Sequence, residues 1–193
     1  MNFKREHIGF GSQVRVVIAI CLLIAAIEMI NILTGRYLNQ FGLIPRKTDA
    51  IHGIILAPLL HGSLMHFFSN IVPLAIFSLL MLQHGTKRFA LVTTGCILIS
   101  GALVWFFGRA TIHIGSSSLI YGYFGYLLLA GILSGKIKLI LISLFVGFVY
   151  GGLIFGVLPS SPYISWESHL FGFVSGLGCA IFWARDKSTD SPN

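Results

Sequence analysis

Six apolar runs, each about as long as a bilayer is thick, occupy most of the chain. A helix needs about 20 apolar residues to cross a hydrocarbon core of about 30 Å. The mean hydropathy of +0.87 and a charged fraction of only 10% lie outside the range of soluble domains. The sequence therefore predicts an all-α polytopic membrane protein with six transmembrane helices. The expected spans are Val14–Leu33, Leu64–Leu82, Phe89–Phe107, Gly115–Leu133, Leu139–Val157 and Glu167–Ala184.

These spans leave little chain for any other structure, so we expect one membrane domain over residues 1–193, with a short polar tail from about residue 185. The first run exceeds a signal-peptide core, and no A-x-A-like cleavage site follows it, so it is expected to be retained. Three cysteines fall within the spans and are interpreted as small buried hydrophobic residues, not as a disulfide framework or metal site. They are Cys21, Cys96 and Cys179.

The net charge of +7 is spread as single or paired basic residues at the ends of spans. This spacing favours membrane topology over nucleic-acid binding, because cytoplasmic loops carry an excess of Lys and Arg. With both termini in the cytoplasm, nine basic residues lie inside and four outside. The sequence thus predicts a multi-pass protein of the cell membrane, the cytoplasmic membrane if the source is bacterial. The inner set is Lys4, Arg5, Arg15, Lys87, Arg88, Lys136, Lys138, Arg185 and Lys187, and the outer set is Arg36, Arg46, Lys47 and Arg109.

Unusual polar residues gather where the second, fourth and sixth spans begin. His61, His66 and Asn70 precede or open the second span, Ser116–Ser118 open the fourth, and His169 opens the sixth. In the predicted orientation all three spans start at the outer face. We therefore expect these side chains to meet at one depth, just below the outer surface, if the three spans are neighbours.

Helical spacing selects among these residues. His66 and Asn70 are four apart and share a helix face, as do Ser117 and Tyr121. His61 lies five residues before His66, about 140° away around an ideal helix. We therefore expect His61 in the connection before the span or at its cap.

Ser117 and His169 supply the nucleophile and base that serine-dependent catalysis needs. His66 and Asn70 could donate hydrogen bonds to an oxyanion. Glu167 lies two residues before His169 and so faces another side of the helix, which favours a dyad over a triad.

Three segments together resemble the signatures of the rhomboid intramembrane serine proteases: "HGSLMHFFSN" (His61–Asn70), "GSSSLIY" (Gly115–Tyr121) and "HLFGFVSG" (His169–Gly176). In that family, H-x4-H-x3-N, G-x-S-G with a tyrosine four after the serine, and H-x2-G-x3-G occur in this order on the second, fourth and sixth spans. The resemblance implies a six-span rhomboid-like bundle with cytoplasmic termini.

The resemblance also implies roles. Ser117 is similar to the family nucleophile, His169 to its general base, and Tyr121 to the residue that stacks on that histidine. The implied oxyanion set is His66, Asn70 and the Ser117 backbone N–H, while His61, Gly115, Gly172 and Gly176 support the site. The two glycines of the sixth span are spaced for close helix approach.

Two positions depart from the family pattern. Ser118 stands where G-x-S-G has its last glycine, which matters if the backbone there needs a positive φ. The Trp-Arg pair that many members carry in the first loop would fall near His52 and Gly53, where this chain has neither residue.

The function implied is hydrolysis of a single-span membrane protein near the outer face, without a metal or other cofactor. The expected partners are transmembrane substrates and the lipid bilayer, and the oligomeric state stays open. Two other classes remain: a catalytically idle relative that escorts membrane clients, and a small transporter with a histidine proton relay. A zinc site from His61, His66 and His169 is disfavoured because no H-E-x-x-H motif is present.

Overall fold

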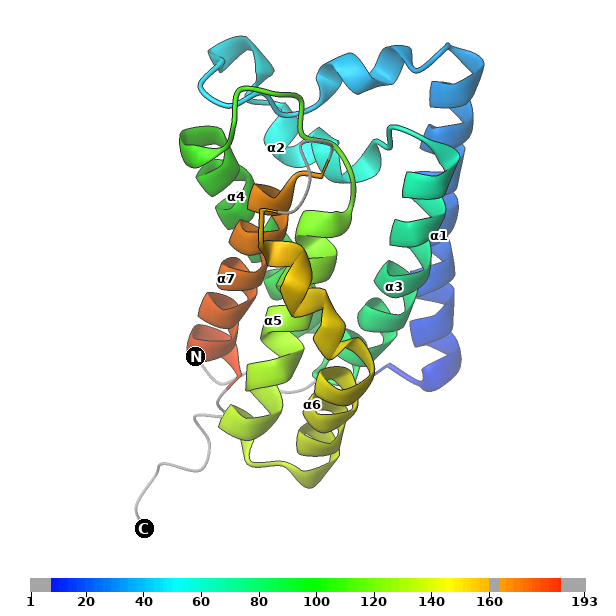
Figure 1. Ribbon diagram of the computed structural model, residues 1–193. Coiled ribbons are helices and arrows are strands. Elements are labelled where there is room, and N and C mark those ends of the chain that lie inside the picture. The colour runs from blue at the N-terminus through cyan, green and yellow to red at the C-terminus, as the bar shows by residue number, and fades with distance from the viewer. Residues whose placement is uncertain (1–7, 160–163, 185–193) are drawn as a thin grey trace.

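The computed structural model of the chain describes residues 8–159 and 164–184, in which helices are joined by turns and loops (Figure 1). The predicted polar tail, and the basic residues Lys4, Arg5, Arg185 and Lys187, lie outside the described residues. The long helices are α1 (Phe10–Leu33), α3 (Leu64–Leu82), α4 (Thr86–Phe107), α5 (Ser117–Ser134), α6 (Ile137–Tyr150) and α7 (Trp166–Trp183). The short elements are η1 (Tyr37–Phe41), η2 (Thr48–Ala50), α2 (Gly53–Leu56), η3 (Ala57–Leu59) and η4 (Gly151–Val157).

Five helical segments of the described chain are long and apolar enough to cross a membrane: α1, α3, α4, α5, and α6 continued through η4. This confirms a multi-pass all-α membrane protein. The helix α7 has 18 residues but is not among the five, because its first turns carry Glu167, Ser168 and His169. The count of six spans and the cytoplasmic termini therefore stay predictions.

Two expected spans differ from the observed helices by four residues or more at one end. The helix α1 begins at Phe10, four residues before the expected start. The expected fifth span is α-helical only to Tyr150 and continues as the 3-10 helix η4. Gly151 and Gly152 open η4, and paired glycines weaken an α-helix because they lose the most backbone freedom on folding.

The helix α5 is the centre of the bundle, packed by α3, α4, α6 and α7 (Figure 1). In its most apolar window 56% of the residues are buried, against 11–33% for the other four spans. Its buried face includes Tyr123, Phe124 and Leu127. The three serines at its start therefore begin the helix that the rest of the protein surrounds.

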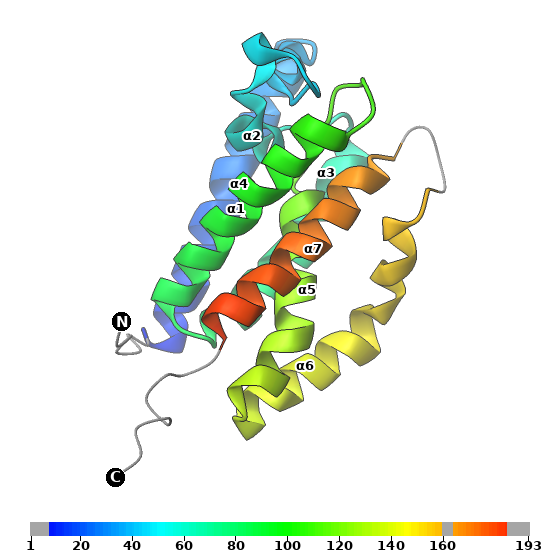
Figure 2. The same cartoon turned by 90° about the vertical axis from the view of Figure 1, so that its left-hand side faces the viewer.

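The close approach of α7 to α5 depends on glycines (Figure 2). A Cβ atom added at Gly172 would overlap the Ser118 carbonyl, and one at Gly176 would overlap the Gly122 carbonyl. Small residues at such contacts let two helix backbones come together without intervening side chains. This packing places the first turn of α7 beside the first turn of α5.

The first loop is anchored by Arg46 and Trp105, which lie away from the positions near His52 where many family members carry their Trp-Arg pair. Arg46 donates to the carbonyls of Phe106 (3.1 Å) and Gly108 (2.9 Å), and the indole N–H of Trp105 donates to the Lys47 carbonyl (3.0 Å). An antiparallel bridge of Leu43 with His113 continues this attachment. The missing Trp-Arg pair near His52 therefore does not leave the loop loose.

Candidate active site

One cavity of about 860 Å³ lies where α3, α5 and α7 begin. The side chains around it come from the connection before α3, the first turns of these three helices, the loop before α5, and η4. Its polar lining includes Ser69, His66, Asn70, Ser117, Tyr121, Ser165 and His169. Its apolar lining includes Met65, Pro73, Ile112, Ile114, Ile120, Leu153 and Ile164.

The three serines at the start of α5 have different surroundings. Ser116 is buried and its hydroxyl donates to the Pro58 carbonyl (2.7 Å), which ties the start of the helix to η3. Ser117 lines the cavity, whereas Ser118 is not among its lining residues and packs its backbone against Gly172 of α7. Ser117 is also the first residue of α5, where backbone N–H groups lack partners within the helix.

The position that needs a glycine is Gly115, before the serines. Its φ is +115°, and an added Cβ would lie 2.6 Å from the His66 Nε2 atom. Ser118 has no such requirement, because among the described non-glycine residues only Arg36 and Arg46 have a positive φ. The replacement of the last motif glycine by Ser118 therefore costs no backbone strain.

The imidazole of His169 is held on two sides. Its Nδ1 lies 2.9 Å from the Gly156 carbonyl, and its ring stacks on Tyr121 with centroids 4.2 Å apart and planes 7° from parallel. A carbonyl can only accept, so Nδ1 carries the proton. In the neutral ring Nε2 then bears the lone pair, which is the state a general base needs.

His66 has the opposite tautomer. The Gly62 backbone N–H donates to His66 Nδ1 over a long 3.4 Å, so the proton of the neutral ring is on Nε2. Ser63 caps α3 and accepts from the His66 backbone N–H (3.1 Å), which fixes this residue in the first turn. His66 therefore presents a donor, and His169 an acceptor.

Asn70 is buried one turn further along α3. One N–H of its amide donates to the His66 carbonyl (2.7 Å), and its Oδ1 is buried without a hydrogen-bond partner among the described residues. The second N–H of the amide lies 3.5 Å from the Ser69 hydroxyl. A contact of that length is at the limit of a hydrogen bond, so the hydrogen-bonding capacity of this second N–H is little used.

The structure thus gathers Ser117, His169, His66, Asn70 and Tyr121 around one cavity. Within the described residues, the Ser117 hydroxyl makes no hydrogen bond with the imidazole of His169. Catalytic hydrogen bonds are often long before substrate binds and shorten in the complex.

His61 does not line the cavity, and it lies before α3, as its spacing predicted. Its side chain is 0% exposed, with its ring edge-on to that of His66 at 5.2 Å between centroids. Neither ring nitrogen has a hydrogen-bond partner in the described part of the chain. His61 is therefore a neighbour of the site, behind His66.

Sequence reasoning missed two groups that hold the start of α7. Arg109 pairs with both carboxylate oxygens of Glu167, and His113 is buried between the Arg109 carbonyl (3.0 Å) and the Ser168 hydroxyl (3.3 Å). It also missed Gly156, which contacts His169 through its backbone carbonyl. Every residue type has this group, so the sequence gives no signal for it. Only the tertiary contact reveals that role.

Burial makes His61 a source of pH-dependent stability. Its pKa is lowered to about 4 by burial, and further by the charges of His66 and Arg36. The unfolded chain, with an ordinary histidine pKa of about 6.5, takes up a proton that the folded state excludes. Stability should therefore fall as the pH drops from about 6.5 to about 4.

Thermal unfolding in detergent at pH 7 and pH 4.5 tests this for wild type and His61→Phe. We expect the melting temperature of wild type to drop by a few °C more than that of the variant, which cannot take up this proton. An equal drop in both proteins would contradict the assignment.

Known proteins resemble this chain over most of its length. The family model for the rhomboid domain matches residues 48–186. An uncharacterised protein of Mycobacterium tuberculosis, and one of Mycobacterium bovis, are 37% identical over 167 residues, covering 82% of this chain and 70% of their own. A Mycobacterium leprae protein is 32% identical over 188 residues, covering 88% of this chain and 74% of its own. The match spans every helix that contributes to the cavity, and the chain therefore belongs to the rhomboid family.

Proposed function

We propose that the protein is an intramembrane serine endopeptidase in which Ser117 is the nucleophile and His169 the general base. The observation that carries the proposal is the pair of opposite tautomers in one cavity. The lone pair of His169 Nε2 and the N–H of His66 Nε2 accompany the Ser117 hydroxyl there. An acceptor for the proton and a donor for the oxyanion are what acyl transfer requires.

In the proposed reaction Ser117 Oγ attacks the scissile carbonyl while its proton moves to His169 Nε2. The oxyanion accepts from His66 Nε2–H, the Ser117 backbone N–H and the second N–H of Asn70, next to the positive end of α5. The protonated imidazole then gives its proton to the leaving amine. Water, activated by the same base, hydrolyses the acyl-enzyme.

The Gly156 carbonyl takes the place that a carboxylate has in a triad. It accepts from Nδ1–H in both charge states of His169, so it keeps the tautomer and favours the imidazolium as it forms. Tyr121 fixes the plane of the ring. The proposed site is therefore a Ser-His dyad in which a backbone carbonyl and an aromatic ring orient the histidine.

We propose single-span membrane proteins as substrates. The cavity lies at the ends of membrane-spanning helices and combines polar catalytic groups with an apolar lining, which suits a transmembrane segment unwinding near the surface. Cleavage near the outer face follows if the charge asymmetry sets the topology. Segments with Gly, Pro or polar residues should unwind most readily.

A fluorophosphonate probe tests the proposal on purified protein in detergent. The serine oxygen forms a bond to phosphorus, fluoride leaves, and the base accepts the serine proton. Peptide mapping by mass spectrometry should locate the adduct on Ser117. Folded protein without an adduct, or with one on another serine, would overturn the assignment and favour a client-binding or transport role.

Gly156 provides a prediction about the base. An added Cβ would overlap the Tyr121 hydroxyl, so Gly156→Ala must move either η4 or the ring stacked on His169. Misplacement by about 1 Å can cost about 10²-fold in rate, so we expect phosphonylation to slow by about that factor.

Gly152→Ala is the matched control, because Gly152 is in the same 3-10 helix and, apart from its chain neighbours, no atom of the described residues lies within 4 Å of its Cβ position. Rate constants for labelling should stay near wild type in this variant. Equal rates for Gly156→Ala and Gly152→Ala would show that Gly156 does not position His169.

A further inference from the structure

The peptide unit between His61 and Gly62 is hydrogen-bonded on both of its sides. The His61 carbonyl accepts from Arg36 Nη1 (2.8 Å) and from Asn31 Nδ2 (3.3 Å). The Gly62 N–H donates to His66 Nδ1 (3.4 Å). In a trans peptide the C=O and N–H point in opposite directions, so holding one fixes the direction of the other.

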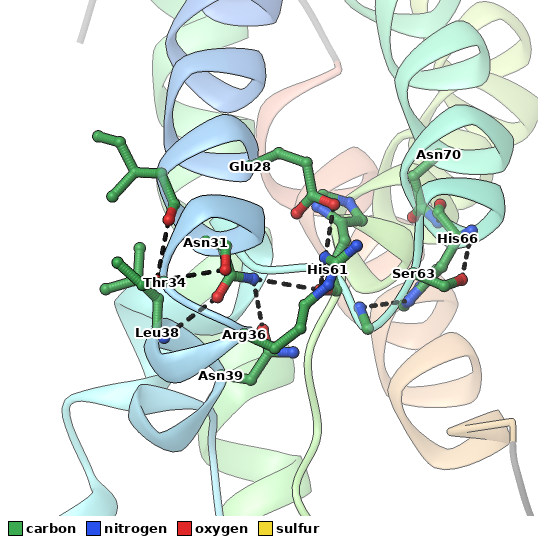
Figure 3. Close-up of polar contacts among 12 residues, drawn as sticks. Glu28, Asn31, Thr34, Arg36, Leu38, Asn39, His61, Ser63, His66 and Asn70 are labelled. Carbon is green, nitrogen blue, oxygen red and sulfur yellow. Dashed lines mark hydrogen bonds and ion pairs between the residues drawn. The ribbon is translucent and has the colours of Figure 1, made fainter.

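The two donors to the His61 carbonyl are themselves fixed by α1 and the turn that follows it (Figure 3). Arg36 Nη1 lies 2.5 Å from Glu28 Oε1, and the Glu28 side chain is only 3% exposed. Asn31 is fully buried; its amide donates to Asn39 Oδ1 (2.9 Å), and its oxygen accepts from the Leu38 N–H (3.1 Å).

Because residue 62 is a glycine, hydrogen bonds are needed to hold the 61–62 peptide in one orientation. A flip of the 61–62 peptide changes the φ of the following residue strongly, and glycine tolerates either sign of φ. After a flip the Gly62 N–H would no longer reach His66 Nδ1. The proton of the His66 ring could then move to Nδ1, leaving a lone pair at Nε2, which would repel an oxyanion instead of stabilising it.

We propose that Glu28, Asn31 and Arg36 form a clamp on the His61–Gly62 peptide that sets the tautomer and orientation of His66. They are positioning residues, because none of the three lines the cavity and each acts on the reaction through other groups, chiefly this peptide. The clamp rests on the proposed function for its effect on catalysis. It precedes residues 48–186, so it lies outside the part of the chain that matches the rhomboid family model.

Arg36→Gln tests the clamp, and Arg46→Gln is its matched control. Both arginines lie in the first loop with a positive φ and donate to backbone carbonyls. Arg46 holds the end of α4 and does not contact the 61–62 peptide. We expect fluorophosphonate labelling of Ser117 to slow at least about tenfold in Arg36→Gln, and to stay within about twofold of wild type in Arg46→Gln.

A spectroscopic measurement tests the same inference without any activity. In protein with ¹⁵N-labelled histidine, the protonated and unprotonated ring nitrogens of a neutral imidazole have well separated chemical shifts. His66 should have its proton on Nε2 in wild type and in Arg46→Gln, and shift towards Nδ1–H in Arg36→Gln. The His66 signals can be assigned by their absence in His66→Asn.

The outcomes separate the clamp from the proposed function. Absence of labelling in wild type would overturn the proposed function, while the tautomer measurement would still decide on the clamp. A wild-type His66 with its proton on Nδ1 would overturn the clamp even if Arg36→Gln fails to fold. Equal labelling and equal His66 spectra in the two glutamine variants would overturn it as well.

Discussion

Replacing Ser117 with alanine should abolish phosphonylation by the probe and hydrolysis of any single-span substrate. Ser117 is the serine on α5 whose side chain lines the cavity shared with His169. Loss of the nucleophile in serine proteases costs about 10⁶-fold in rate, because the covalent acyl-enzyme can then no longer form. Labelling stoichiometry and the cleavage of a tagged substrate in proteoliposomes measure the effect.

The neighbouring hydroxyl supplies the control. Ser118→Ala removes a side chain of the same kind one residue further along α5, on the α7 side of the helix. We expect this variant to label at a rate near that of wild type. Full labelling of Ser117→Ala would show that another serine is the nucleophile. Loss of labelling in both variants would point to disruption of α5 instead.

Replacing Gly176 with alanine should separate α7 from α5. The added methyl group would overlap the Gly122 carbonyl and lie 2.9 Å from the Tyr126 nitrogen, and both of these are backbone atoms that cannot rotate away. Overpacking of this kind costs about 1–3 kcal/mol, and more where the backbone must move. We expect a lower melting temperature together with slower labelling, since α7 carries His169.

Gly178 lies on the same helix, and within residues 8–159 and 164–184 no atom outside the local helix backbone lies within 4 Å of its Cβ position. Gly178→Ala introduces the same methyl group and the same gain in helix propensity, up to about 1 kcal/mol. Its stability should therefore equal or exceed that of wild type. A melting temperature for Gly176→Ala as high as that of Gly178→Ala would show that the helices adjust to the methyl group without cost.

Much of the architecture could be predicted from the chain because membrane helices are long and apolar. Four of the expected spans correspond to single helices among the five apolar segments, and the fifth corresponds to α6 with η4. The sixth is less evident from hydropathy, because the polar residues at the start of α7 lower its apolarity. It was predicted as an apolar run like the other five, and its status as a span stays a prediction.

The candidate site was predictable to the extent that its residues are uncommon in lipid. Histidine, asparagine and serine near the ends of spans are conspicuous, so Ser117, His169, His66 and Asn70 could be named beforehand. The groups that orient them could not. Gly156 and the 61–62 peptide contribute backbone atoms, and Arg36 resembles any interfacial cation until its contact with Glu28 is known.

The sequence by itself determined that the chain is a membrane protein of several helices and which side chains could carry its chemistry, because hydrophobicity and residue type are local properties. Only the tertiary structure shows which groups the two histidine rings contact, and it is from these contacts that their tautomers are inferred. A hydrogen bond between distant backbone and side-chain groups depends on helix packing to within a fraction of an ångström, and the order of the residues does not contain that distance.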